Sequence, residues 1–268
     1  MTVFSRDILA DRERRLELLE LLRESVERGF AGFTIHYQPQ VDTVSGRLCG
    51  AEALARWHCT KYGDVSPGEF IPLMEQSGLI IPFGQWILSR GMAQCLEWCR
   101  FRPDFQISVN LSYIQLAQGD FISFLRTALE EHSLAPSKII LELTETYLAK
   151  AEEDTLRMIA QMKELGVKIA MDDFGVGYSS LFSLKSIPVD VVKIDRGFVK
   201  GITSDLFNAT FIRSITDLCH DVGRKVCLEG VETEEEYEAV RELGMEYIQG
   251  YYFGRPMSAR QFEDRLKE

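Results

Sequence analysis

The strongest constraint on the fold is an alternation of short apolar, β-branched runs with longer helical patterns. Eight runs predict strands, at 33–38, 48–57, 106–111, 138–143, 167–171, 189–194, 225–228 and 246–248. Helical patterns separate most of them, at 67–77, 85–99, 120–132, 152–165, 196–220 and 233–243. Strands that alternate with helices need crossover connections, which are typical of a mainly parallel sheet.

This number of strands predicts a closed α/β barrel of the TIM type, (β/α)8, in preference to an open sheet. The length of 268 residues suits a barrel that folds as one domain. No helical pattern separates the first two runs, so we expect the first strand to be antiparallel to the second. Residues 30–268 are assigned to this barrel.

The segment before the barrel, residues 1–29, has its own pattern. It is strongly charged but places apolar side chains at Leu9, Leu16, Leu19, Leu22 and Val26, which predicts an amphipathic helix. Such a helix can pack on the barrel or link it to a further domain. We favour a linking helix that also packs.

Several helix ends have recognisable capping residues. Thr233 is followed three residues later by Glu236, the spacing of a capping box. Gly166, Gly223 and Gly244 come just after predicted helices, where a left-handed cap favours glycine.

Charge and composition exclude some classes of protein. The net charge of -11 argues against broad electrostatic binding to nucleic acid or to anionic membranes. It leaves an anionic substrate open, because bound divalent cations can reverse the local sign of a site. Cys95 and Cys99 are one helical turn apart, and we expect them to share a buried face as free thiols. With neither a signal peptide nor an apolar run long enough to cross a membrane, we expect a cytoplasmic protein.

Polar residues recur where the predicted strands end, which is where barrel enzymes carry their chemistry. Seven consecutive strands have one: Glu52, Asn110, Glu142 with Glu145, Asp172 with Asp173, Lys193 with Asp195, Glu229, and Gln249. A single residue of this kind is commonly a cap or a surface charge, but capping does not explain seven strands in succession. We therefore expect these side chains to share one barrel mouth.

A cluster of carboxylates at one mouth needs a compensating cation, because neighbouring carboxylates repel one another. Oxygen ligands without thiolate or imidazole favour Mg²⁺ or Mn²⁺ over zinc. The consecutive Asp172 and Asp173 suggest two ions, with one aspartate bridging both. Two ions can stabilise the attacking and the leaving oxygen of a phosphoryl displacement.

The same residues belong to an ordered set of motifs. These are Tyr37-Gln38-Pro39, Glu52-Ala53-Leu54 within 50–57, SPGEFIP at 66–72, VNLS at 109–112, ELTE at 142–145, DDFGVGYSS at 172–180, VDVVKID at 189–195, EGVET at 229–233, and QGY at 249–251 with Arg255-Pro256. In this order they resemble the EAL domain family from Phe30 to the C-terminus. A lone E-A-L tripeptide occurs by chance, but the ordered set is specific. The resemblance implies a TIM-like barrel with an antiparallel first strand that hydrolyses cyclic di-GMP to linear 5′-pGpG with two Mg²⁺ or Mn²⁺ ions.

The resemblance also assigns roles to single positions. It implies Glu52, Asn110, Glu142 and Asp172 as ligands of one ion, and Asp172, Asp173 and Glu229 as ligands of the second. Lys193 is implied to orient the attacking water, and Glu229 to accept its proton, with Glu52 part of the same catalytic centre. Gln38, Arg56, Asp195 and Gln249 are implied as substrate contacts, and Glu145 as the residue that steadies loop 174–180.

The resemblance further implies a homodimer and an upstream sensor or GGDEF-type domain, with cyclic di-GMP as the ligand. Two positions depart from the usual pattern of the family. Val176 stands where threonine or alanine is usual, and we interpret it as tolerated variation. Leu228 stands where a small residue commonly precedes Glu229, and we expect it to repack the barrel interior.

Three alternatives remain open at this point. An EAL domain can act as a receptor that binds cyclic di-GMP without cutting it, although such domains usually lose metal ligands and this chain keeps them. Lys193 could form a Schiff base, as in class I aldolases, if it were a free amine. An enolase-like Mg²⁺ site is the third alternative, but the ordered motifs do not match it.

Overall fold

The structure, a computed structural model, describes residues 3–117, 120–149, 153–177 and 180–267. Its strands are β1 Phe33–Asp42, β2 Leu48–Cys59, β3 Gly63–Val65, β4 Gln106–Asn110, β5 Ile139–Thr144, β6 Lys168–Phe174, β7 Val191–Ile194, β8 Lys225–Glu229 and β9 Tyr247–Gln249. Its helices are α1 Val3–Glu27, α2 Pro67–Ser77, α3 Ile80–Trp98, α4 Tyr113–Ala117, α5 Phe121–His132, α6 Glu145–Leu148, α7 Glu153–Glu164, α8 Ser180–Ser186, α9 Leu206–Asp221, α10 Glu234–Val240 and α11 Ala259–Lys267, with short 3₁₀ helices η1 Pro136–Lys138 and η2 Arg196–Phe198. The predicted helix start at Glu152, the end of the predicted barrel at Glu268 and the side chain of Leu9 lie outside the described residues.

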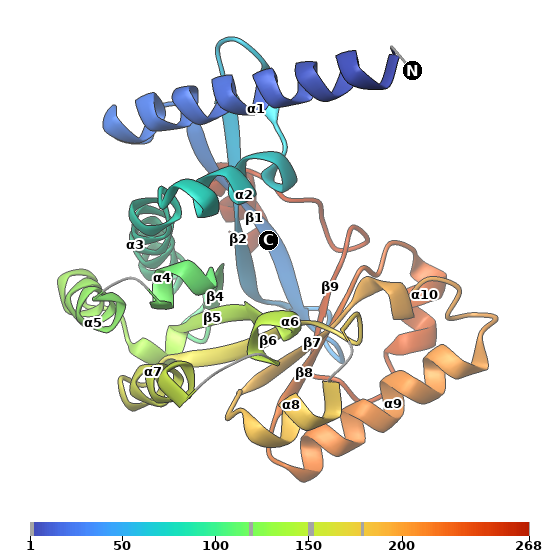
Figure 1. The fold of residues 1–268 in the computed structure, drawn as a ribbon. Helices are drawn as coiled ribbons and strands as arrows, with labels where there is room; N and C mark the ends of the chain where they lie inside the picture. Colours follow the sequence, from blue (N-terminus) through green and yellow to red (C-terminus); the bar gives the residue numbers. More distant parts are fainter. Residues whose placement is uncertain (1–2, 118–119, 150–152, 178–179, 268) are drawn as a thin grey trace.

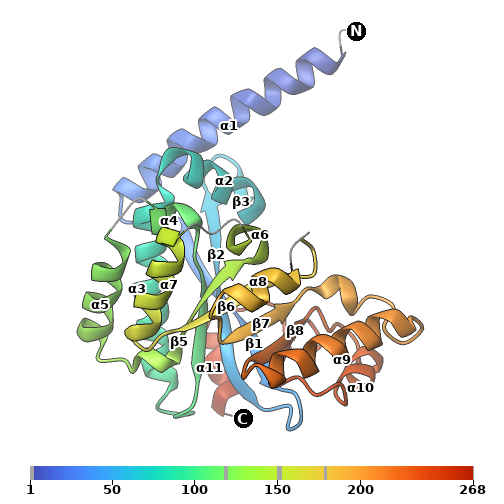
Figure 2. The same ribbon diagram turned by 60° about the horizontal axis from the view of Figure 1, so that its bottom comes forward.

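The strands close into a barrel, as predicted. Their order is β1-β9-β8-β7-β6-β5-β4-β2, and pairing of β1 with β2 closes the ring, while β3 extends β2 as a hairpin. β1 is antiparallel to both neighbours and the other barrel pairs are parallel, which confirms the expected exception. The reason is local, because only the short turn 43–47 joins β1 to β2 and leaves no room for a crossover helix. Figures 1 and 2 show helices surrounding the central strands.

One predicted helix is wrong. The pattern 196–220 was expected to be continuous, but it consists of η2 and α9, separated by an irregular stretch. Gly201 adopts a left-handed φ of 78° in this stretch, which a continuous right-handed helix does not accommodate. Asp205 then caps α9, because its side chain accepts a hydrogen bond from the backbone N–H of Phe207.

The predicted helix ends at Thr233, Gly166 and Gly223 are confirmed, whereas the one at Gly244 is wrong because α10 already ends at Val240 and is followed by Arg241 in a right-handed conformation. Thr233 and Glu236 form the complete capping box at the start of α10. Gly166, Gly223 and Gly244 have φ values of 91°, 73° and 99°, in the left-handed region that favours glycine.

Helix α1 packs with its C-terminal half and projects with its N-terminal half (Figures 1 and 2). Leu18 and Leu22 are fully buried, and α1 contacts α2. Arg14 forms an ion pair with Glu69 of α2 at 2.7 Å. The packing that we expected for this helix is therefore present.

The interior of the barrel is separate from the larger apolar layer between strands and helices. Ile140, Ala170, Val191 and Cys227 form a small cluster inside the barrel. Leu228 was expected in this interior, but it lies in the outer core because neighbouring strand residues point to opposite faces. The expectation for Leu228 was therefore wrong.

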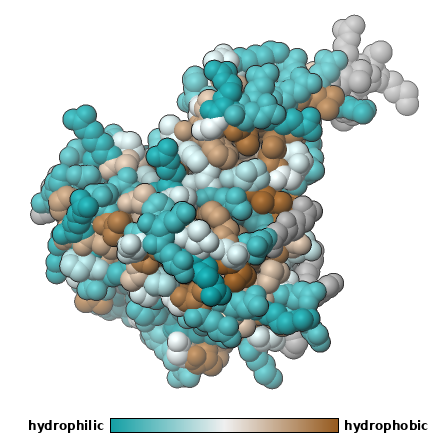
Figure 3. Space-filling model, turned by 90° about the vertical axis from the view of Figure 1, so that its left-hand side faces the viewer, coloured by the Kyte–Doolittle hydropathy of each residue, from teal (hydrophilic) through white to brown (hydrophobic). Residues whose placement is uncertain are grey.

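The outer surface is largely polar on the face that Figure 3 presents, with apolar residues in several separate groups. All six cysteines are free thiols, which confirms the expectation for Cys95 and Cys99. Among the described residues, no helix combines the length and apolarity that a membrane span requires.

Candidate active site

The inward-facing residues of the strands form two layers, an upper layer of polar side chains at the barrel mouth and a lower layer of mostly smaller side chains beneath it. Residues two apart on a strand share a face, so each inward polar residue lies above an inward residue nearer the strand start. The pairs are Gly50 and Glu52, Ser108 and Asn110, Ile140 and Glu142, Ala170 and Asp172, Val191 and Lys193, Cys227 and Glu229, and Tyr247 and Gln249. The lower residues line one small interior cavity, together with Glu142 and Lys193.

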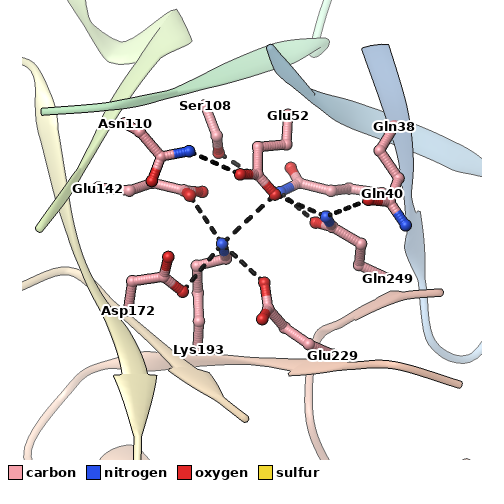
Figure 4. Close-up of polar contacts among 10 residues, drawn as sticks. All are labelled: Gln38, Gln40, Glu52, Ser108, Asn110, Glu142, Asp172, Lys193, Glu229 and Gln249. Carbon is pink, nitrogen blue, oxygen red and sulfur yellow. Dashed lines mark hydrogen bonds and ion pairs between the residues drawn. The ribbon is translucent and has the colours of Figure 1, made fainter. Parts of the chain in front are cut away.

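Lys193 lies at the centre of the upper layer (Figure 4). Its Nζ is 2.7 Å from Glu142 Oε2, 2.7 Å from Glu229 Oε1, 3.1 Å from Asp172 Oδ1 and 3.6 Å from Glu52 Oε2. The residue is 2% exposed. Four of the predicted acidic residues therefore converge on one buried ammonium group.

The site shifts the pKa values of its own groups. Burial alone lowers the pKa of Lys193, but the surrounding carboxylates outweigh it and hold this pKa well above its usual value. Burial raises the pKa of Glu142, against the attraction of Lys193. Burial likewise raises the pKa of Glu229 to about 7, with Lys193 opposing and Asp172 reinforcing the rise. Because Lys193 is held protonated, it is unsuited to a Schiff base, which needs a neutral amine.

Amide groups hold the Glu52 carboxylate from two sides. Asn110 Nδ2 donates to Glu52 Oε1 at 2.7 Å, and Gln249 Nε2 donates to Glu52 Oε2 at 2.6 Å. Gln249 Nε2 also donates to Gln38 Oε1 at 3.2 Å. Since Asn110 donates through its nitrogen, its carbonyl oxygen is left for another partner.

Asp173 and Asp195 differ from the central acidic residues. Asp173 lies where the register of β6 against β7 shifts, between Met171 and Phe174, and it has a left-handed φ of 56°. Partial burial of its carboxyl, together with Asp172, raises its pKa. Asp195 accepts a hydrogen bond from the backbone N–H of Gly197 at 2.8 Å and caps η2, which is a local structural role.

The donor set suits hard cations, because it consists of carboxylate and amide oxygens. Glu142 Oε1 is buried without a hydrogen-bond partner among the described residues, which is unusual for a carboxylate oxygen. In the described part of the chain, however, no three histidine, cysteine or acidic side chains are grouped to hold an ion as they stand. The ammonium of Lys193 occupies the centre instead, so an ion has to compete with it for the same carboxylates.

Glu145 makes the contact with the following loop that was predicted for it. It is 1% exposed, and its Oε2 accepts hydrogen bonds from the backbone N–H groups of Gly175 at 3.0 Å and Gly177 at 3.4 Å. A Cβ atom at Gly177 would lie 2.8 Å from Glu145 Oε1, so a larger residue here would displace the Glu145 carboxylate. Val176 points outward and is 65% exposed. Tyr178 and Ser179 of this loop lie outside the described residues.

Two hollows open beside the carboxylates and meet at Leu54. The smaller, about 190 Å³, is lined by Gln38, Glu52, Asp172, Glu229 and Gln249, with Arg196 and Tyr251 at its side. The larger, about 520 Å³, is mostly apolar and has Arg56 and Asn110 in its wall. Arg56 is half-buried and donates one hydrogen bond to the carbonyl oxygen of Ala55 at 2.8 Å.

Sequence reasoning missed four residues near the site. Arg196 and Tyr251 line the smaller hollow, and each lies within two residues of a predicted site residue, Asp195 or Gln249. Gln40 and Ser108 lie in the layer below and are buried. Each is two residues from a predicted site residue on the same strand, and this spacing was the available signal.

Comparison with known proteins gives a consistent result. Residues 20–256 match the family described as "EAL domain". The chain is 39% identical over 259 residues to the bifunctional diguanylate cyclase/cyclic di-GMP phosphodiesterase MucR of Pseudomonas aeruginosa, covering 96% of this chain and 38% of that protein. It is 35% identical over 242 residues to the cyclic di-GMP phosphodiesterase PdeR of Escherichia coli, covering 90% of this chain and 36% of that protein. The chain thus spans less than two fifths of either relative.

A solved structure is also similar. The complex of the PaMucR phosphodiesterase with c-di-GMP superposes with a TM-score of 0.84 at 40% identity, covering 92% of this chain and 99% of that one.

Proposed function

The chain belongs to the EAL domain family, and from this premise we propose that it is a metal-dependent phosphodiesterase that converts cyclic di-GMP to linear 5′-pGpG at the barrel mouth. The observation that carries the proposal is the convergence of Glu52, Glu142, Asp172 and Glu229 on one buried ammonium group. A surface cap or a structural ion pair does not need four acidic residues from four strands.

The oxygen donors suit two Mg²⁺ or Mn²⁺ ions. We propose Glu52, Asn110, Glu142 and Asp172 as ligands of one ion, and Asp172, Asp173 and Glu229 as ligands of the other. When bound, such ions supply Lewis-acid stabilisation to phosphate oxygens and ease deprotonation of a water molecule. The carbonyl oxygen of Asn110 and the unpaired Oε1 of Glu142 are donors that support this assignment.

In the proposed reaction, water attacks phosphorus and the bond from phosphorus to the 3′ oxygen breaks. Glu229 accepts the proton of the attacking water; its pKa is raised to about 7 in the cation-free site, and a bound cation would lower it. Lys193 orients the water and balances the negative charge that develops on the phosphate, because it stays protonated throughout. The 3′ oxygen takes up a proton from solvent and leaves as a hydroxyl, and Glu229 releases the proton that it accepted to solvent before the next turnover.

The two hollows suit a ligand with two lobes around a central phosphate ring. We propose that one guanine base lies in each hollow, with Gln38 and Gln249 contacting the substrate on the side of the smaller one. Arg56 lines the larger hollow and can recognise a phosphate oxygen or a guanine edge. Asp195 is the weakest of the proposed substrate contacts, because it is engaged with Gly197.

We further propose that the chain acts in the cytoplasm as part of a longer protein. MucR, whose name combines a cyclase with a phosphodiesterase, supports an upstream GGDEF-type or sensor domain joined through residues 1–29. A homodimer is proposed on family membership alone.

The experiment is hydrolysis of cyclic di-GMP by the purified protein with Mg²⁺ or Mn²⁺, followed by chromatography. We expect 5′-pGpG with either ion, and intact substrate with EDTA or in Glu52→Ala. Glu164→Ala, an exposed glutamate on α7, is the matched control and should retain activity. Tight binding of cyclic di-GMP without any cleavage under both ions would instead identify a receptor.

A further inference from the structure

A hydrogen-bonded chain runs beneath the site and ends on Glu52 (Figure 4). Gln40 Nε2 donates to Gln249 Oε1 at 3.0 Å and to Ser108 Oγ at 3.4 Å. Gln249 Nε2 in turn donates to Glu52 Oε2 at 2.6 Å. Gln40 thus reaches a central carboxylate through one intermediate amide.

The chemistry of the groups gives this chain a direction. An ionised carboxylate only accepts hydrogen bonds, so Gln249 has to turn its NH₂ toward Glu52 and its carbonyl oxygen the other way. That oxygen needs a donor, and the NH₂ group of Gln40 supplies one. Without a donor at position 40, the carbonyl oxygen of Gln249 loses its partner, and the amide is less firmly held with its NH₂ group toward Glu52.

Burial indicates that these polar side chains do more than fill space in the barrel interior. Gln40, Ser108 and Gln249 are 7%, 1% and 4% exposed. The opposite wall of the same barrel layer is filled by apolar residues, including Ile140 and Val191. Because a buried amide is costly unless it is hydrogen-bonded, apolar residues would fill the wall below Glu52 at lower cost.

The backbone provides room for Gln40. Gln40 is the register partner of Gln249 on β9 and of Gly50 on β2. A Cβ atom at Gly50 would lie 2.9 Å from Gln40 Oε1, so glycine opens the space that the amide occupies. The strand register changes directly after Gln40, at Val41.

We propose that Gln40 is a positioning residue, which fixes the amide of Gln249 and through it holds the Glu52 carboxylate ready for a divalent cation. Ser108 assists by accepting the second hydrogen bond of Gln40. The part of this inference that concerns the cation rests on the function proposed above.

The test compares substitutions that reverse or retain the donor. Gln40→Lys keeps a donor toward Gln249, whereas Gln40→Glu offers only acceptors and turns the Gln249 amide around. Simple charge effects predict the opposite order, because an added glutamate attracts a cation and an added lysine repels it. Isothermal titration with Mn²⁺ should therefore give weaker binding for Gln40→Glu than for Gln40→Lys, and the reverse order would overturn the proposal.

A neutral substitution carries the test if a charged variant does not fold. Gln40→Met, of similar length, should raise the dissociation constant for Mn²⁺ about 3- to 10-fold, the effect of one buried hydrogen bond. Excess Mn²⁺ should restore most of its lost activity, which a general folding defect would not allow. Gln161→Met on the exposed face of α7 is the control and should match wild type.

A readout without cation separates this inference from the proposed function. Hydrogen exchange of the Gln249 side-chain NH₂ group, followed by NMR in EDTA, should be slow in wild type because the group donates to Glu52 and Gln38. Gln40→Met should accelerate it at least about tenfold, and equal rates would overturn the proposal even if cyclic di-GMP is hydrolysed. Conversely, accelerated exchange in a protein that cuts no cyclic di-GMP would support Gln40 and reject the phosphodiesterase.

Discussion

Replacing Lys193 by methionine tests the electrostatic centre most directly. Its ammonium lies within 3.6 Å of four carboxylates and is 2% exposed, so methionine retains most of the volume but removes the neutralising charge. In the absence of divalent cations, the carboxylates are left to repel one another in a poorly hydrated interior. We therefore expect Lys193→Met to destabilise the cation-free protein.

The magnitude follows from the geometry. Removing one partner of a buried, hydrogen-bonded ion cluster costs about 3–5 kcal/mol. For a domain of this size, about 1 kcal/mol corresponds to roughly 2–4 °C in Tm, so Tm should fall by about 6–20 °C. The pKa of Lys193 is raised, so its stabilisation is complete at and below neutral pH and is lost only at strongly alkaline pH. Burial raises the pKa values of Glu142 and Glu229, and methionine removes the attraction of Lys193 that opposes this rise, so the deficit of the variant should grow as pH rises from about 5 to 8.

The assay is urea unfolding in EDTA at several pH values, with Lys200→Met as the matched control. Lys200 is exposed and follows η2, so its replacement should change the free energy of unfolding by less than about 0.5 kcal/mol. Mn²⁺ should recover more stability in Lys193→Met than in wild type, because the competing ammonium is gone. A Lys193→Met protein as stable as Lys200→Met in EDTA at pH 8 would refute the description of the site as a charge-compensated cluster.

Three further outcomes are expected. Glu229 has a pKa raised to about 7, so its contribution to the stability of the cation-free protein is full in acid and is lost as pH rises through 7. Glu229→Gln removes this titration and should flatten the fall of Tm between pH 5 and 8. An unchanged slope of Tm against pH in EDTA would contradict this. Glu145→Ala leaves the N–H groups of Gly175 and Gly177 unpaired and should lower the free energy of unfolding by about 1–3 kcal/mol. Amide exchange at both glycines should be faster and turnover lower, and unchanged exchange would show that Glu145 does not steady the loop. Thr233→Ala breaks the capping box of α10 and should cost about 1 kcal/mol in urea unfolding, while hydrolysis of cyclic di-GMP stays at the wild-type rate.

Most of the fold could be predicted because its signals are local. The alternation of strands and helices, the capping box at Thr233 and the antiparallel β1 depend on short stretches of chain, and the structure confirms them. The continuous helix predicted over 196–220 was wrong for a reason of the same scale. Its apolar period continued across a turn at Gly201, whose left-handed φ interrupts the helix between η2 and α9.

The site could be predicted as a set of residues but not as an arrangement. Strand ends indicated which acidic residues share the mouth, since parallel strands point the same way. They did not indicate that Lys193 lies at the centre of the carboxylates, which depends on the stagger of β7 against its neighbours. Leu228 was assigned to the wrong face because its neighbour Glu229, not Leu228 itself, points inward.

By itself, then, the sequence determined most of the elements, the barrel class and the set of polar residues at the strand ends, because periodicity, capping and motif order are properties of neighbouring residues. Only the tertiary structure decided which of those residues meet. Gln40 and Gln249 are separated by 209 residues and touch only because the pairing of β1 with β9 brings them side by side in the closed barrel. A contact of that kind depends on register and burial across the whole ring, and neither is written in any short stretch of the chain.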